Sequence, residues 1–184
     1  MPREGQEIVN PRTGQRMRFV QMRDDELRID SVNPPTDERE PEHVHPKQES
    51  GAEVRTGSLV FEIDGKSRRV GPGESITIPA NTRHRFWNES EEPAQSVQIF
   101  RPALEIAAFF ETYFELARRG RLKEGGDVPL LQVAAMVPVF RDEIRLTNPP
   151  WPIVRVVSAL LGPIARRRGY RGRLEYGLGT SGSG

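Results

Sequence analysis

Residues 43–57 read HVHPKQESGAEVRTG, and residues 73–88 read GESITIPANTRHRFWN. In the second stretch, polar and apolar residues alternate from Ser75 to Ile78, as in a β-strand with one buried face. In the first, His43 and His45 are two positions apart, so a strand would direct both imidazoles to one face of a sheet. Such a pair alone is more often solvated or structural than a pair of ligands. His84 is the third histidine of the chain, and a small β fold could return it beside the first two.

Short alternating runs separated by turn signals extend this β pattern on both sides. Asp64-Gly65, a strong two-residue hairpin signal, lies between two of these runs. No long helical pattern separates the runs, which argues against a parallel α/β sheet. We therefore predict a mainly β, antiparallel sandwich or barrel over residues 1–101. The expected strands are Gln6–Asn10, Gln15–Val20, Leu27–Val32, Glu53–Ile63, Lys66–Val70, Ser75–Ile78, His84–Trp87 and Ser96–Phe100.

The two quoted stretches resemble the two sequence motifs of the cupin superfamily. The first family motif is HxH, three or four residues, Glu, six residues and Gly, and Gly57 matches its end. The second is G(x)5PxG(x)2H(x)3N, with matches at Gly73, Pro79, His84 and Asn88. Asn81 stands at the internal Gly of this motif, and Asn tolerates a positive φ better than most residues. The resemblance implies a double-stranded β-helix, or jelly-roll barrel, with a ligand cavity inside.

In cupins, three histidines and one glutamate hold a divalent metal, and the resemblance assigns His43, His45 and His84 to the histidine positions. The fourth position is open. The shorter spacer after the HxH pair gives Glu49 as a possible fourth ligand, whereas the six-residue spacer before the final glycine gives Ser50. If Ser50 points inward, Glu49 lies on the other face of the strand, and the site consists of three neutral imidazoles. Such a site suits Fe, Zn, Ni or Cu better than the harder Mn.

The residues expected to line a substrate pocket are Ser50, Ala52, Phe86 and Trp87. Ser50 and Ala52 share one face of their strand, and their small size would leave room for a bulky organic ligand. Of Phe86 and Trp87, one is expected to face the cavity and the other the outer packing layer.

These features give three hypotheses of function. The first is a small-molecule enzyme of the cupin type, an isomerase, cyclase or dioxygenase-like enzyme with a divalent metal on the three histidines. No further catalytic residue is assigned. The second is a metal-free cupin that only binds a small organic molecule. The third is an assembly or membrane-associated module that acts through its C-terminal helices.

Composition and charge change near residue 101. Residues 1–100 carry 14 basic and 18 acidic side chains, whereas residues 101–184 carry 13 and 8. Longer runs with helical spacing follow this point. We therefore predict a cupin barrel over residues 1–101, a helical extension over 102–176 and a flexible tail or appended linker over 177–184. Helices are expected from Pro102 to the residue before Gly120, at about Pro129–Leu146 with an interruption at Pro138, and at about Pro152–Arg168 with an interruption at Gly162-Pro163.

The third expected helix is apolar around much of its circumference and ends in Arg166-Arg167-Arg168. We favour a helix end whose arginines complement the macrodipole, ahead of contact with a membrane surface. Nucleic-acid binding is not expected, because no groove-reading motif accompanies the arginines. Burial of the apolar helices predicts a homodimer.

Composition excludes several classes of protein. The chain contains no Cys, so it has no disulfide, thiol nucleophile or cysteine metal site. Its formal net charge is only +1, which argues against general binding of nucleic acid. It contains neither a secretory signal pattern nor an apolar run long enough to span a membrane, so we expect a cytoplasmic protein.

Overall fold

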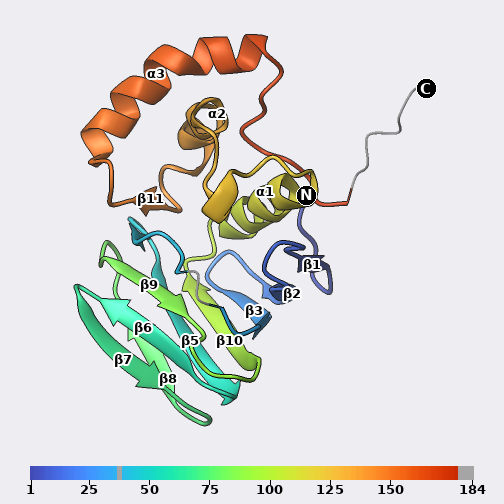
Figure 1. Cartoon of the computed structure of the whole chain (residues 1–184), viewed down its shortest axis with the longest axis vertical. Helices are drawn as coiled ribbons and strands as arrows, with labels where there is room; N and C mark the ends of the chain where they lie inside the picture. Colours follow the sequence, from blue (N-terminus) through green and yellow to red (C-terminus); the bar gives the residue numbers. More distant parts are fainter. Residues whose placement is uncertain (37–38, 178–184) are drawn as a thin grey trace.

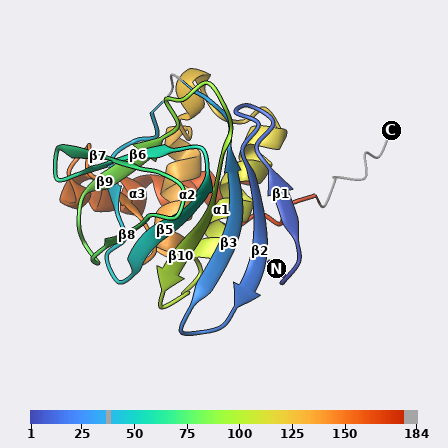
Figure 2. The same cartoon turned by 90° about the horizontal axis from the view of Figure 1, so that it is seen from below.

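The computed structural model describes residues 1–36 and 39–177. Within them, two antiparallel sheets form a barrel that is covered at one end by helices (Figures 1 and 2). One sheet has the order β1-β2-β3-β10-β5-β8 and the other the order β11-β4-β9-β6-β7. The strands are β1 Glu7–Val9, β2 Arg16–Met22, β3 Leu27–Asn33, β4 His43–Val44, β5 Glu49–Thr56, β6 Leu59–Ile63, β7 Lys66–Val70, β8 Ser75–Ile78, β9 His84–Trp87, β10 Ala94–Arg101 and β11 Arg145–Leu146. The predicted antiparallel, mainly β fold with a C-terminal helical region is therefore confirmed.

The core of the barrel consists of the inward side chains of both sheets. They are Ala52, Val54, Leu59, Phe61, Val70, Ile76, Ile78 and Ala94. The prediction of one strand from Glu53 to Ile63 is wrong, because the chain turns between β5 and β6. Gly57 adopts φ +70° there, and a Cβ at this position would lie 2.8 Å from the Cα of Ala94. Only glycine fits this turn without strain.

Helix α1 (Ile106–Arg118) packs on the part of the larger sheet that the barrel core leaves open. Ile106 and Phe114 meet the inner side chains of β1, β2 and β3 there. The sequence predicted that this helix begins at Pro102, but it begins at Ile106. The buried amide of Gln48 donates hydrogen bonds to the carbonyls of Pro102 (2.9 Å) and Ala103 (2.8 Å), which hold this segment in a turn.

The remaining helices form a layer above the barrel (Figure 1). After a short 3-10 turn, η1 (Glu124–Gly126), come α2 (Leu130–Phe140) and α3 (Trp151–Arg167), which pack on each other. The prediction of one helix from Pro129 to Leu146 is wrong at its C-terminal end. The expected interruptions are wrong as well, because α2 continues through Pro138 and α3 continues through Pro163. The chain leaves α2 after Phe140, and β11 pairs with β4 through Arg145–Val44 and Leu146–His43. This added strand joins the C-terminal segment to the barrel.

Within residues 1–36 and 39–177, none of the helices is both long and apolar enough to cross a bilayer. Most of the predicted tail at 177–184 lies outside the described residues.

Candidate metal centre

The structure brings the three histidines together inside the barrel. His43 on β4 pairs directly with His84 on β9, and His45 follows at the end of β4. The ring centroids are 4.5 Å (His43 to His84), 5.1 Å (His43 to His45) and 5.2 Å (His45 to His84) apart. One ring nitrogen from each histidine lies within 4.8 Å of the other two. All three side chains are buried, so the cluster belongs to the interior.

Backbone carbonyls fix the orientation of each ring. The Nδ1 atoms lie 3.0 Å from the Pro41 carbonyl for His43, 2.6 Å from the Glu143 carbonyl for His45, and 2.8 Å from the Thr82 carbonyl for His84. A carbonyl oxygen only accepts hydrogen bonds, so each Nδ1 must carry the proton and donate. The Nε2 atom of each neutral ring then keeps a free lone pair. Fixing the ring through its second nitrogen is how proteins orient metal-binding histidines.

The electrostatic surroundings keep the three rings uncharged. Burial lowers the pKa of His43, and burial together with the neighbouring rings lowers the pKa of His45 well below 6.5. Burial and the nearby His43 lower the pKa of His84 to about 4. At neutral pH the imidazoles are therefore in the form that ligates metals, and no proton has to be displaced.

Glu49 does not join the cluster, although the sequence left it as a possible fourth ligand. Alternation along β5 places Ser50 inward, where it is buried and lines the cavity, and Glu49 on the opposite face. The Glu49 carboxylate pairs with Arg101 at 3.3 Å. The centre that the structure assembles therefore consists of three neutral imidazoles, and the residue at the inward position of β5 is the uncharged Ser50.

An apolar cavity of about 650 Å³ extends from the histidines to the C-terminal helices. Three of the four predicted pocket residues, Ser50, Ala52 and Phe86, line it. Trp87 does not. Alternation along β9 turns Trp87 away from His84 and Phe86, and its ring lies under the guanidinium of Arg39 at 4.3 Å. Most of the remaining lining consists of aromatic and aliphatic side chains, among them Phe61, Phe100, Phe109, Phe110, Val133, Met136, Phe140 and Val157.

Glu40 is a cavity residue that the sequence analysis missed. It lies in the polar, proline-rich segment before β4, where no periodicity indicates a direction for its side chain. Its carboxylate accepts a hydrogen bond from the Phe86 N–H at 3.1 Å and lies near His84. Burial raises the pKa of Glu40 to about 7, although His84 and the Phe86 N–H act in the opposite direction. A carboxyl group with this pKa both holds and releases a proton near neutral pH.

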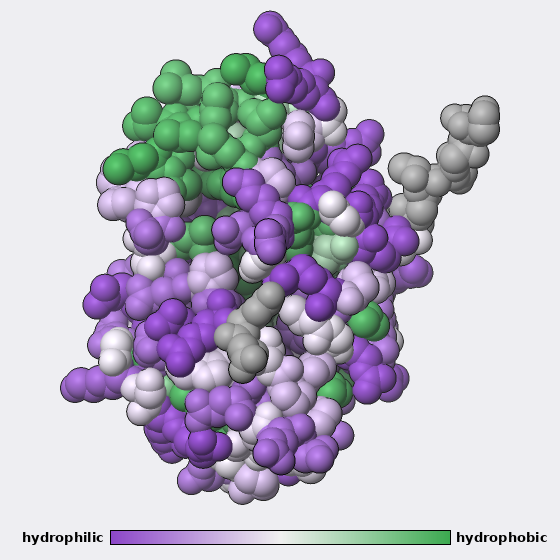
Figure 3. Space-filling view, in the orientation of Figure 1, coloured by the Kyte–Doolittle hydropathy of each residue, from purple (hydrophilic) through white to green (hydrophobic). Residues whose placement is uncertain are grey.

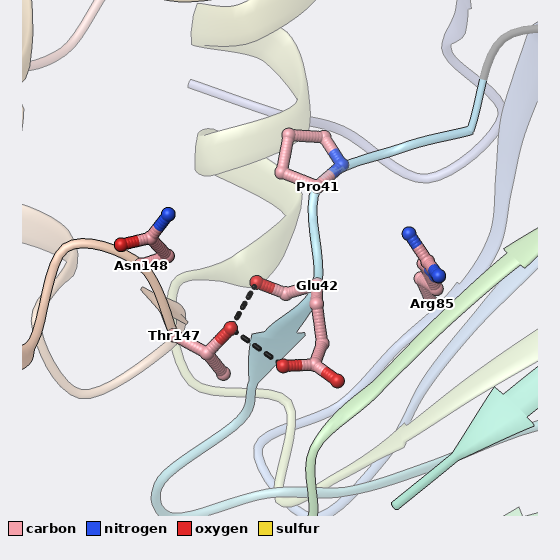
Figure 4. A pocket seen from close by; sticks show the side chains of 5 residues that line it. All are labelled: Pro41, Glu42, Arg85, Thr147 and Asn148. Carbon is pink, nitrogen blue, oxygen red and sulfur yellow. Dashed lines mark hydrogen bonds between the residues drawn. The ribbon is translucent and has the colours of Figure 1, made fainter. Parts of the chain in front are cut away.

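The C-terminal segment also contributes to the centre. Besides the Glu143 carbonyl that orients His45, the backbone of β11 holds β4 by strand pairing. Figure 4 shows the continuation of this contact beside a smaller pocket, where the Thr147 hydroxyl donates to the carboxylate of Glu42 at 2.7 Å. Arg85 on the far side of this pocket is paired with Glu62 at 2.7 Å. The segment that carries His43 is therefore held in place by β11 and Thr147 of the C-terminal part of the chain.

The fold and the cluster define a small antiparallel β-barrel protein with an internal ligand cavity and a three-histidine centre. The sequence profile of the family described as Cupin domain matches residues 31–100, which contain all three histidines and Ser50. This match covers less than half of the chain, so the similarity to the cupin family concerns residues 31–100.

Curated relatives match parts of the chain. Polyketide synthase CurC of Streptomyces cyaneus is 37% identical over 60 residues, which is 33% of this chain and 39% of that protein. The probable oxidoreductase patJ of Aspergillus clavatus is 30% identical over 94 residues, which is 47% of this chain and 29% of that protein. The chain thus spans less than half the length of the curated relatives that it matches.

Solved structures resemble about half of the chain. KdgF from Halomonas sp. is 22% identical with a TM-score of 0.45, over 48% of this chain and 81% of that chain. An RmlC-like cupin from Shewanella frigidimarina is 17% identical with a TM-score of 0.47, over 54% of this chain and 86% of that chain.

Proposed function

We propose that this protein is a metal-dependent cupin enzyme that acts on an apolar organic substrate inside the barrel. The observation that carries the proposal is the set of three buried imidazoles, each fixed through Nδ1 by a backbone carbonyl so that its Nε2 lone pair is free. These three lone pairs face the cavity close to one another, which is the arrangement that a bound metal ion requires.

The residues fit a divalent transition metal held by His43, His45 and His84. Neutral nitrogen ligands suit Fe, Zn, Ni or Cu, and a donor set of imidazoles alone makes the hard ion Mn a weaker fit. A three-ligand site leaves coordination positions for a substrate. Such a metal, when bound, supplies Lewis acidity that polarises an oxygen of the substrate.

The cavity supports an apolar and partly aromatic substrate. Phe61, Phe86, Phe100, Phe109 and Phe110 line it, and aromatic walls favour flat rings. The names of the two curated relatives, a polyketide synthase and a probable oxidoreductase, agree with an enzyme of small-molecule metabolism. We propose a multi-ring or polyketide-like compound that places an oxygen toward the histidines.

Glu40 supports proton-transfer chemistry over oxygen insertion. Its carboxyl group lines the same cavity as His84 and titrates near neutral pH, where a general acid or base is most effective. We propose that Glu40 takes a proton from the substrate or returns one to it, as an isomerase or a cyclase requires.

The decisive measurement is the metal content of the purified full-length protein, together with the rise in melting temperature when metal is added. We expect about one transition metal per chain and a thermal shift, both lost in His84→Ala. Phe86→Leu is the matched control, because it alters the same strand and the same cavity without removing a ligand. Retention of metal by His84→Ala, or absence of metal and of any thermal shift in the native chain, would overturn the proposal.

A non-catalytic binding protein is the second candidate, and the size and apolar lining of the cavity favour it. In that case the native chain would bind an apolar dye in the cavity with the same affinity before and after EDTA treatment. It would also bind no metal.

A further inference from the structure

Helix α3 presents several of its large apolar side chains to solvent, whereas its most buried side chains are small. Ser158, Gly162 and Ala165 are buried, and Ala165 packs against Ala134 and Ala135 of α2. The exposed apolar face of α3 consists of Ile153, Val156, Leu160 and Ile164, which recur at helical spacing. Val156 is 60% exposed and Leu160 is 69% exposed. Figure 3 shows the resulting hydrophobic patch at the α3 end of the molecule.

The charged side chains of the segment that carries this face have one sign. From Thr147 to Leu174 the sequence contains six arginines and no acidic residue. Arg166, Arg167 and Arg168 are exposed at the C-terminal end of α3, and Arg155 is exposed within it. An exposed apolar stripe beside arginines, with no carboxylate in the same segment, is the composition of a helix that lies in the interface of an anionic bilayer. The same segment of a second copy of this chain would offer these arginines no carboxylate.

The apolar face is also continuous with the cavity. Leu130 at the start of α2 and Ile153 on α3 both line the cavity, and they are 54% and 53% exposed. Val154 and Val157, from the same helix, line the cavity as well. The α3 end of the cavity is therefore bordered by side chains that also belong to the exposed patch.

We infer that the exposed apolar face of α3 docks on an anionic lipid surface and sets the cavity against the bilayer. Apolar burial of the stripe supplies the attraction to the lipid, and the arginines supply the preference for negative headgroups. An apolar ligand dissolved in the bilayer then enters beside Leu130 and Ile153 without crossing water. Docking itself needs no metal, so its failure would leave the proposed metal chemistry intact.

Co-sedimentation of the full-length chain with vesicles tests this inference. We expect binding to vesicles of equimolar phosphatidylcholine and phosphatidylglycerol, much weaker binding to phosphatidylcholine alone, and a decrease with added salt. The double variant Val156→Ser, Leu160→Ser should weaken binding by roughly tenfold or more, because about two buried aliphatic side chains are lost. Both positions are more than half exposed, so circular dichroism should show an unchanged fold.

A charge-matched pair of variants separates specific docking from net charge. Arg166→Gln with Arg167→Gln should weaken binding to the anionic vesicles by roughly tenfold. Lys66→Gln with Arg68→Gln removes the same charge from the exposed strand β7, far from α3 in Figure 1, and should leave binding unchanged. Failure to sediment with anionic vesicles at low salt would overturn the inference. A dimer that Val156→Ser with Leu160→Ser converts to monomers, without vesicle binding, would overturn it in favour of a second copy.

Discussion

Replacement of the cavity acid by its amide, Glu40→Gln, should stabilise the metal-free protein, and only above a defined pH. The side-chain amide oxygen of the variant keeps an acceptor for the Phe86 N–H, so the substitution removes the charge and retains the shape. The unfolded carboxyl group ionises near 4.5, whereas the folded one stays protonated up to about pH 7. Between these two values the folded state binds more protons, and the stability of the native chain therefore falls as pH rises through the window.

The magnitude follows from the interval between the two pKa values. At about 1.4 kcal/mol per pKa unit, the interval from 4.5 to about 7 corresponds to about 3 kcal/mol. Glu40 keeps partial contact with solvent, so we expect Glu40→Gln to gain about 1–2 kcal/mol at pH values above 7 and almost nothing near pH 4.5. His84 acts in the opposite direction, because its lowered pKa removes stability as pH falls from 6.5 toward about 4. Both proteins contain His84, so its contribution largely cancels when the free energy of unfolding of the native chain is subtracted from that of the variant.

Urea unfolding of EDTA-treated protein at about pH 8 and about pH 5 measures the free energies of unfolding of Glu40→Gln and of the native chain. Glu91→Gln, an exposed position with the same change of charge, is the control and should shift neither value. An equal gain in the free energy of unfolding at the two pH values would refute the reasoning, because a gain that is independent of pH does not come from ionisation of the carboxyl group. No gain at about pH 8 would refute it as well.

Three further changes have definite outcomes. Ser50→Glu places a carboxylate at the inward position and should tighten metal binding by at least about tenfold, or about 1.4 kcal/mol, in isothermal titration calorimetry. Glu115→Gln should cost about 1–3 kcal/mol at pH 7 in urea unfolding, because the buried carboxylate accepts hydrogen bonds from Arg118 and Arg119. Burial alone would raise the pKa of Glu115, but these arginines lower it to about 2, so the loss should vanish as pH falls from 4.5 toward 2. Gly51→Ala puts a Cβ 2.3 Å from the Ile76 carbonyl oxygen and should lower the melting temperature by roughly 5 °C or more.

The histidine cluster could be predicted from the sequence, because strand alternation and turn conformation determine most of it. A spacing of two placed His43 and His45 on one face, and the turn before His84 accepted Asn81, which takes φ +63° in the structure. The same alternation rule, counted from His84, would have turned Phe86 inward and Trp87 outward. The choice between Glu49 and Ser50 depended instead on strand register, since two family spacers disagreed by one residue.

Other features depend on contacts between distant residues, which a single sequence does not reveal. Glu40 lies in a segment without periodicity, and its place in the cavity wall depends on the hydrogen bond from Phe86. The two residues of β11 continue a helical pattern in the sequence, and only the free edge of β4 makes them a strand. Helix α1 begins later than the sequence predicted, because the buried amide of Gln48 donates hydrogen bonds to the carbonyls of Pro102 and Ala103.

The bond from His45 to the Glu143 carbonyl has a consequence for how proteins of this kind are compared and dissected. The family profile ends at residue 100, so a comparison limited to it contains every histidine but not the acceptor that decides which nitrogen of His45 is free. In an excised barrel ending at residue 101, His45 would lack this acceptor and could adopt either tautomer. A hybrid that joins this barrel to another C-terminal segment would need a carbonyl at the same point to keep the donor set.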